Sequence, residues 1–213
     1  MRVVAIVPAY NEEKTIANVL SVLTEAHQVA TVIVVNDGSS DKTAQVAAQF
    51  NVILINLEEN QGKGGAMLAG LGHSVADIFL FLDADLIGLR LDHIETILAP
   101  VLDGRADMSL GLFEKGRVVT DLAQKMAPYL SGQRAMRTKV LKNIEDFDIS
   151  RFGVEMAITK AVKRQGFIVT EVQLKDLSHV TKEEKLGVIK GLVARLKMYV
   201  EIARALSRMD EPK

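Results

Sequence analysis

The sequence predicts an α/β fold: a mainly parallel mixed sheet flanked by helices. In the first half of the chain, short apolar runs rich in β-branched residues alternate with helical patterns, and a polar cluster follows each run. Strands that alternate with helices of roughly ten to fifteen residues are typical of parallel sheets covered on both faces. Ligands of such sheets bind at the carboxyl ends of the strands, which is where the polar clusters fall.

The elements of the first half follow one another in a βαβ rhythm. Strands are expected at residues 3–7, 32–35, 52–57 and 78–82, the last leading into Asp83. The first helix is predicted by Ile16, Val19, Leu20 and Leu23, which share one face at helical spacing. Further helices are expected after Ser40 and after Gly64.

The second half predicts a more mixed arrangement within the same domain. Helices are expected at residues 91–102, around 120–127, at 152–165 with Gly166 as the stop, and at 186–207, with strands at 108–112 and 168–172. No linker or repeat divides the chain. We therefore predict one domain over residues 1–213, with a nucleotide-facing half at 1–85 and a more variable half at 86–213.

Composition limits the function classes. The 213 residues, 48% of them hydrophobic, suffice for one substantial core, and a net charge of -1 without a basic block argues against nucleic-acid binding. The absence of cysteine excludes disulfides and thiolate metal sites. No apolar run reaches the roughly 20 residues of a spanning helix, and the first run is short for a signal peptide, so we expect a cytoplasmic protein.

Two carboxylates, Asp83 and Asp85, come directly after the apolar run 78–82. Side chains two residues apart at a strand end project to the same face. Neighbouring carboxylates repel unless they share a cation or a proton, and oxygen ligands suit Mg²⁺ or Mn²⁺. The pair therefore predicts a divalent metal that carries a phosphate as another ligand. The alternative is that both residues only end the strand.

Two further clusters are consistent with a nucleotide. In the segment 36–41, Gly38 relieves a tight turn and Ser40 can cap a helix, whereas Asp37 either binds a base or ribose or belongs to the turn. In Gly62-Lys63-Gly64-Gly65, backbone N–H groups at a helix start and the charge of Lys63 could bind a diphosphate. The spacing differs from a Walker loop, and by itself the segment would also suit a flexible turn.

In order along the chain, these segments resemble the nucleotide-sugar half of GT-A glycosyltransferases of the family 2 type. The matching stretches are Val7-Pro8-Ala9-Tyr10-Asn11-Glu12, Val35-Asn36-Asp37-Gly38-Ser39-Ser40-Asp41, Asn60-Gln61-Gly62-Lys63-Gly64-Gly65-Ala66 and Leu82-Asp83-Ala84-Asp85. The resemblance implies a single GT-A, Rossmann-like domain. It also implies that the donor contacts are Pro8, Ala9, Tyr10, Glu12, Asp37, Gly62, Lys63, Asp83 and Ala84. Asp85 matches the principal metal ligand, and Asp83 lies nearer the ribose and donor sugar.

The second half resembles glucosyl-3-phosphoglycerate synthases over shorter motifs. These are Leu130-Ser131-Gly132-Gln133-Arg134-Ala135, Arg151-Phe152-Gly153-Val154-Glu155 and His179. In those enzymes a similar Gly-Val-Glu segment and a late His line the donor and metal site, which implies His179 as a second metal ligand. This chain departs from their pattern at Gln133, where they carry Glu, so the acceptor does not transfer.

Several residues of the second half keep more than one interpretation. Glu155 is the candidate catalytic base of an inverting enzyme, positions a substrate in a retaining one, or only complements a helix N-terminus. Arg134 and Arg137 either hold an acceptor phosphate or belong to a solvated face. The amphipathic helix 186–207, with its basic polar side, either lies on an anionic membrane, packs on the domain or forms a dimer seam.

The predicted function is metal-dependent transfer of a sugar from a UDP- or GDP-linked donor. Asp85 and Glu155 are the catalytic candidates, and the acceptor is a phosphorylated small molecule or a lipid phosphate. One alternative is a sugar-phosphate nucleotidyltransferase, although Pro8-Ala9-Tyr10-Asn11 replaces the Gly-rich basic loop expected there. The other is a non-catalytic nucleotide-binding protein, because a fold does not by itself determine function.

Overall fold

The computed structural model describes residues 1–113, 131–142 and 154–180. The chain divides into two compact units, Met1–Ser178 and His179–Lys213, and only His179 and Val180 of the second unit are described. The helices expected around 120–127 and at 186–207 lie outside the described residues, as does the start of the helix expected from 152. The prediction of one domain over residues 1–213 therefore stays a prediction.

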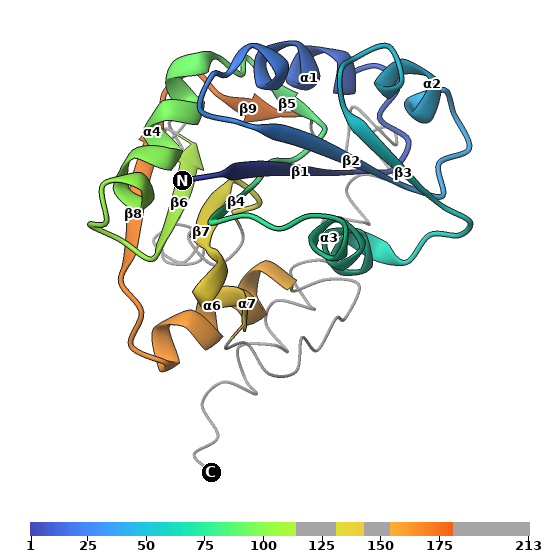
Figure 1. Cartoon of the computed structure of the whole chain (residues 1–213). Helices are drawn as coiled ribbons and strands as arrows, with labels where there is room; N and C mark the ends of the chain where they lie inside the picture. The colour runs from blue at the N-terminus through green and yellow to red at the C-terminus, as the bar shows by residue number, and fades with distance from the viewer. Residues whose placement is uncertain (114–130, 143–153, 181–213) are drawn as a thin grey trace, which may run out of the picture. The chain divides into compact units, whose positions relative to one another are not determined.

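A seven-stranded sheet forms the centre of the first unit (Figure 1). Its strands are β1 (Val3–Ala9), β2 (Thr31–Asp37), β3 (Ile53–Leu57), β4 (Ile78–Phe81), β6 (Met108–Phe113), β7 (Arg134–Arg137) and β8 (Val169–Leu174). They lie in the order β3-β2-β1-β4-β7-β6-β8. All neighbouring pairs are parallel except the two that β7 makes, with β4 and with β6. A second sheet has two short strands, β5 (Leu86–Ile87) and β9 (Ser178–His179).

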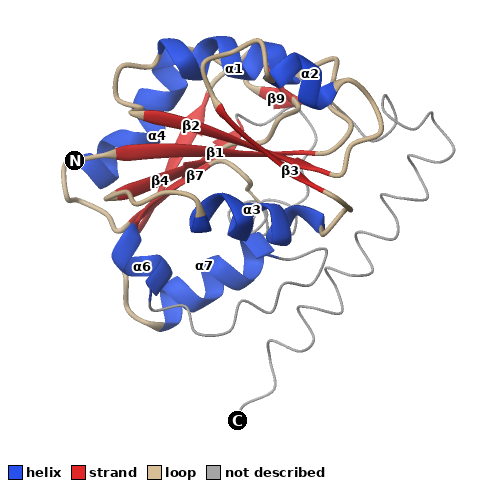
Figure 2. Cartoon of the chain, turned by 45° about the vertical axis from the view of Figure 1, so that its right-hand side comes forward, coloured by secondary structure: helices blue, strands red, loops and turns tan. Residues whose placement is uncertain are grey.

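Helices cover both faces of the sheet, as the parallel strands require. They are α1 (Ile16–Glu25), α2 (Thr43–Ala47), α3 (Gly62–Gly72), α4 (Leu91–Leu102), α6 (Thr138–Lys142) and α7 (Val154–Arg164). Figure 2 shows α1, α2 and α4 on one face and α3, α6 and α7 on the other. The predicted α/β class with a mainly parallel mixed sheet is confirmed. No helix in the described ranges is both long enough and apolar enough to span a membrane.

Strand β1 shows why its sequence is apolar without interruption. Val3, Ala5 and Val7 belong to the core shared with α1 and α4, whereas Val4 and Ile6 belong to the core shared with α3 and α7. Successive side chains of a strand point to opposite faces, so a strand covered on both sides needs apolar residues at every position.

The structure corrects two of the predicted boundaries and adds a central strand. Helix α3 begins at Gly62, so Gly62 and Lys63 belong to its first turn instead of preceding it. Strand β4 ends at Phe81, and Asp83 and Asp85 therefore lie in the following loop, where strand alternation does not determine their directions. Strand β7 was not predicted at all, although it occupies a central place in the sheet.

Candidate active site

The candidate site lies at the edge of the sheet where β1, β2 and β4 end. These strands are parallel neighbours, so the loops that follow them leave from the same edge. Strand β7 runs the other way, and its first residue, Arg134, pairs with Phe81 at the end of β4. The antiparallel strand therefore brings residues 131–133 to the loop that carries Asp83.

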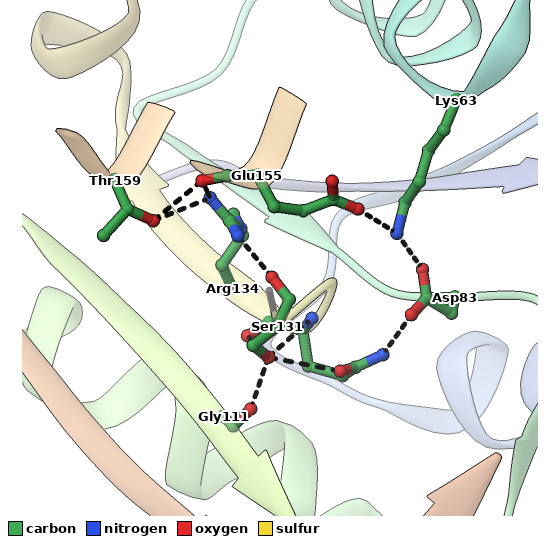
Figure 3. A network of polar contacts seen from close by, with 8 residues as sticks. Lys63, Asp83, Gly111, Ser131, Arg134, Glu155 and Thr159 are labelled. Atoms are coloured by element: carbon green, nitrogen blue, oxygen red, sulfur yellow. Dashed lines mark hydrogen bonds and ion pairs between the residues drawn. The ribbon is translucent and has the colours of Figure 1, made fainter. Parts of the chain in front are cut away.

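Lys63 is the centre of a polar network at this edge (Figure 3). Its Nζ lies 2.5 Å from Asp83 Oδ1 and 2.6 Å from Glu155 Oε1. Gln133 Nε2 donates to the other oxygen of Asp83, at 2.7 Å. Residues from α3, the loop after β4, the loop before β7 and the first turn of α7 thus meet in one chain of contacts.

The charges of this network stabilise one another. Burial lowers the pKa of Lys63, but the attraction and hydrogen bonds of Asp83 and Glu155 raise it more, so the pKa ends above its ordinary value. Lys63 is therefore a permanent cation between two carboxylates at neutral pH. The sequence prediction that Lys63 and Asp83 share one site agrees with this geometry, and Glu155 joins them.

Gly132 packs directly against this network. A Cβ atom added at Gly132 would lie 2.6 Å from Lys63 Nζ and closer still to both carboxylate oxygens of Asp83. Ser131, its neighbour, donates through Oγ to the carbonyl of Gly111 at 2.5 Å, which fixes the loop to β6. A side chain at position 132 would therefore require the ends of the Lys63 and Asp83 side chains to shift.

The burial of Arg134 contradicts the interpretation that this residue belongs to a solvated face. Its side chain is completely buried, with 0% exposure. The guanidinium donates through Nη1 to the carbonyl of Glu155 at 3.1 Å and through Nη2 to the carbonyl of Ser131. Arg137, at the other end of β7, is half-buried and donates to the carbonyl of Val101 at 3.0 Å.

The loops after β1 and β2 are joined by hydrogen bonds. Asn11 Oδ1 accepts from the backbone N–H of Ser40 at 2.9 Å, and Glu13 Oε2 accepts from that of Lys42 at 2.9 Å. In return, Asp41 Oδ2 accepts from the backbone N–H of Glu13 at 3.1 Å. The predicted polar clusters of the first and second strands are therefore one connected surface.

Asp37 has a structural function that the sequence did not reveal. It is 3% exposed, and its Oδ1 accepts from the backbone N–H of Gln61 at 2.7 Å, immediately before α3 begins. Gly38, at φ 68°, approaches the same segment so closely that a Cβ would lie 2.8 Å from the backbone N of Asn60. Asp37 therefore positions the start of α3, whatever it binds in addition.

The remaining predicted donor contacts differ in exposure. Tyr10 is 48% exposed and can reach a ligand, whereas Ala9 and Ala84 are buried. Pro8 and Glu12 are intermediate, and the backbone N–H of Glu12 donates to Thr43 Oγ1 at 2.8 Å. Gly62 forms the first residue of α3. Apart from Gly62, these residues lie on β1 or on the loops of the same edge. Gly62 follows Gln61, whose backbone N–H donates to Asp37 at that edge.

The two predicted metal ligands lie in different units of the chain. Asp85 is half-buried in the turn between β4 and β5, and His179 is an exposed residue of β9 at the start of the second unit. No group of three or more His, Asp or Glu side chains that could hold a metal occurs in the described residues.

Sequence reasoning missed the hydrogen bond of Gln133 to Asp83 and the backbone contacts of Arg134. Both residues stand in the stretch 130–135 that was singled out for its resemblance, and Gln133 was noted as a departure. Their roles depend on β7, which the sequence pattern did not predict.

The chain is similar to known proteins. The model of the family described as glycosyl transferase family 2 matches residues 4–160. A 4,4'-diaponeurosporenoate glycosyltransferase of Staphylococcus aureus (strain USA300) is 36% identical over 98 residues, which are 44% of this chain and 26% of the relative. The chain thus spans about a quarter of the length of the curated relatives it matches.

Solved structures are similar over a larger part of the chain. The glucosyl-3-phosphoglycerate synthase of Mycobacterium tuberculosis in complex with Mn²⁺ and UDP-glucose has a TM-score of 0.79 and 25% identity, covering 100% of this chain and 80% of that chain. Its complex with Mn²⁺, UDP and glucosyl-3-phosphoglycerate has a TM-score of 0.74, again at 25% identity, with 91% and 79% covered.

Proposed function

This chain belongs to glycosyl transferase family 2, and we propose that it transfers a sugar from a nucleoside diphosphate donor to an acceptor hydroxyl. The observation that carries the proposal is the Lys63 network at the carboxyl edge of the sheet. A lysine held at 2.5 and 2.6 Å from two carboxylates, in the first turn of a helix, combines a fixed cation with backbone N–H groups. Such an arrangement suits a diphosphate.

We propose Asp85 as a protein ligand of Mg²⁺ or Mn²⁺, and His179 as a second ligand remains a prediction. The fit rests on the chemistry of the donor set: Mg²⁺ is usually held by one or two carboxylates together with substrate phosphates, and a larger protein cage is not required. The described residues contain no such cage, and Asp85 is a half-buried carboxylate on the loop of the site. When bound, the metal would stabilise charge on the departing diphosphate. The similar synthase structures contain Mn²⁺ or Mg²⁺ with UDP.

Other residues of the chain would bind the nucleoside and the diphosphate of the donor. Tyr10, with the neighbouring Pro8, Ala9 and Glu12, would contact the nucleoside, and Asp37 would hold the start of α3 while it faces the ribose. Gly62 and Lys63 would bind the diphosphate. Ala84 lies between the two acids on the loop.

Asp83 and Glu155 would act on the sugar and the acceptor. Asp83, fixed by Lys63 and Gln133, would orient the ribose or donor sugar. If the reaction inverts the sugar, Glu155 Oε2 would accept the proton of the acceptor hydroxyl while Oε1 stays on Lys63. If it retains the configuration, Glu155 would position the acceptor or the donor sugar instead.

We propose as acceptor a phosphorylated small molecule or a lipid phosphate. The structural relatives support the first, because they were solved in complex with glucosyl-3-phosphoglycerate or with phosphoglyceric acid. Contact of the segment 186–207 with a membrane, its use in a homodimer and a cytoplasmic location remain predictions.

A donor assay tests the proposal. Release of UDP or GDP from UDP- and GDP-sugars would be measured with Mn²⁺, with Mg²⁺ and after chelation, for the unmodified chain and for Asp85→Ala. We expect chelation to abolish turnover and Asp85→Ala to lower kcat/KM on the order of a hundredfold or more. Binding of Mn²⁺, followed by paramagnetic resonance, should weaken in the same variant.

The control is Asp103→Ala, which removes an exposed aspartate at the end of α4 that pairs with Arg105. It should leave turnover and metal binding unchanged. Turnover without metal, or full activity of Asp85→Ala, would overturn the mechanism. Release of pyrophosphate from a nucleoside triphosphate and a sugar phosphate would indicate the nucleotidyltransferase, and binding of UDP without any turnover would indicate the non-catalytic protein.

A further inference from the structure

Arg134 occupies an unusual position for a cation. It is fully buried at the first residue of β7, beside the end of β4, and burial lowers its pKa to about 10 although the attraction of Glu155 and Asp83 raises it. It therefore keeps its charge at neutral pH. Taking a guanidinium out of water costs several kcal/mol, so a buried one requires compensating contacts.

Within the described residues, those contacts are two backbone carbonyls and a hydroxyl. Nη1 donates to the carbonyl of Glu155 at 3.1 Å and lies 3.5 Å from Thr159 Oγ1, and Nη2 donates to the carbonyl of Ser131. Nε has no hydrogen-bond partner in the part of the chain that the structure describes. The planar fork of one guanidinium thus connects the first turn of α7 to the loop before β7.

Both segments end at the Lys63 network, as Figure 3 shows. Glu155 presents its carbonyl to Arg134 and its carboxylate to Lys63, so a shift of the carbonyl moves the carboxylate with it. Ser131 precedes Gly132, the residue that packs against Asp83 and Lys63. A single buried side chain therefore fixes the backbone beneath both carboxylates of the site.

We propose that Arg134 is a positioning residue for the sugar transfer, acting through Glu155 and the Ser131 loop without touching substrate. This inference rests on the proposed function. The inference extends the proposed function by assigning the placement of the Glu155 carboxylate on Lys63 to a residue of strand β7. The two positive charges, Lys63 and Arg134, also match the two negative charges of Asp83 and Glu155.

The test compares Arg134→Met and Arg134→Lys, each alone and combined with Glu155→Gln. The matched control is Arg137→Met, because Arg137 lies on the same strand and also donates to a backbone carbonyl, that of Val101, away from the Lys63 network. Steady-state kinetics, with whichever donor the assay under "Proposed function" identifies, separates kcat from KM, and thermal unfolding reports the stability of each variant.

We expect Arg134→Met to lower kcat about tenfold to a hundredfold, since misplacement by about 1 Å has effects of that order. The donor KM should change less than about threefold, because the groups that bind the diphosphate remain. Arg134→Lys, which keeps the charge but not the fork, should recover part of kcat. In the Glu155→Gln background, Arg134→Met should cause little further loss, because the two residues act as one unit.

Equal, small effects of Arg134→Met and Arg137→Met on kcat would overturn the proposal. So would a loss from Arg134→Met that is as large with Glu155→Gln as without it. If Arg134→Met does not fold, Arg134→Lys decides, and unchanged kcat in that variant would overturn the proposal.

If the unmodified chain turns over no donor, the proposed function fails, and crystal structures of the variants judge the positioning separately. Displacement of Glu155 from Lys63 beyond the roughly 4 Å limit of an ion pair would support it. A Glu155 carboxylate that stays at 2.6 Å from Lys63 in both variants would overturn it.

Discussion

Replacing Gly132 with alanine tests how tightly the loop before β7 packs on the site. Gly132 has no positive φ, so its backbone conformation is open to alanine, and the effect of the substitution comes from the added methyl group. The new Cβ would lie 2.6 Å from Lys63 Nζ, against 3.4 Å for the closest ordinary contact. The loop or the lysine must therefore move by about 0.8 Å, and Asp83, whose oxygens lie even closer, must move as well.

The loss of stability caused by Gly132→Ala can be bounded from the packing at this position and from the ion pair between Lys63 and Asp83. Forcing a methyl group into a filled site costs about 1–3 kcal/mol, and the half-exposed pair of Lys63 and Asp83 adds at most about 1 kcal/mol if it separates. A destabilisation near 2 kcal/mol would lower Tm by about 4–8 °C for a chain of this length. The same displacement should reduce kcat/KM for the donor at least about tenfold.

Gly72→Ala is the matched control, since its added Cβ meets no atom within 4 Å at the last residue of α3. We expect Gly72→Ala to keep full turnover and to change stability by less than about 1 kcal/mol, in the stabilising direction. Thermal unfolding and donor turnover of the two variants would be measured together. If Gly132→Ala matched Gly72→Ala in both, the close packing of the loop against Lys63 and Asp83 would be wrong.

Two further predictions concern carboxylates and pH. Gln133→Glu replaces the amide that donates to Asp83 with a third carboxylate, so it should destabilise the chain by about 1–3 kcal/mol at pH 7. This loss of stability should shrink as pH falls towards the ordinary pKa of Glu, about 4.3, because protonation restores a donor. The control is Gln173→Glu at an exposed position. A loss of stability that does not depend on pH would contradict the reasoning. Burial raises the pKa of Asp41, but hydrogen bonds from Thr43 and from the backbone of Glu13 lower it more, so the net pKa is below 3.8. As pH falls, the unfolded chain therefore binds the proton before the folded chain does. The stability that Asp41 contributes is present above about pH 4 and is lost as pH falls through the folded pKa. In urea unfolding, the free energy of unfolding of Asp41→Asn should fall less steeply with decreasing pH than that of the unmodified chain, and equal slopes would refute the assignment.

The fold could be predicted largely from the first half of the chain. The unbroken apolar run of β1 and the helical spacing of Ile16, Val19, Leu20 and Leu23 specify elements buried as expected. Strand β7 could not be predicted, because Arg134-Ala135-Met136-Arg137 begins and ends with arginine and offers two apolar residues. The attraction of Glu155 and Asp83 for the buried guanidinium, which lets this segment enter the sheet, is a tertiary property.

The contacts within the site could be predicted only in part, because they also depend on tertiary structure. The sequence placed Lys63, Asp83 and Glu155 among the site candidates, and the structure brings these three side chains into contact. It could not show that Lys63 and Gln133 engage both oxygens of Asp83, because Gln133 is 50 residues away and reaches Asp83 through the antiparallel register of β4 and β7. The functions of Asp85 and His179 remain predictions.

The place of β7 in the sheet also constrains the order in which the chain can fold. Strands β3, β2, β1 and β4 are neighbours and come from residues 3–81, so this parallel block can pair as soon as it has left the ribosome. Strand β6 is synthesised next, but it reaches the block only through β7, which follows about twenty residues later. Until residues 134–137 emerge, the edge of β4 is unpaired and open to other strands. Strand β7, which borders the candidate site, is therefore also the segment that covers the β4 edge of the nascent sheet.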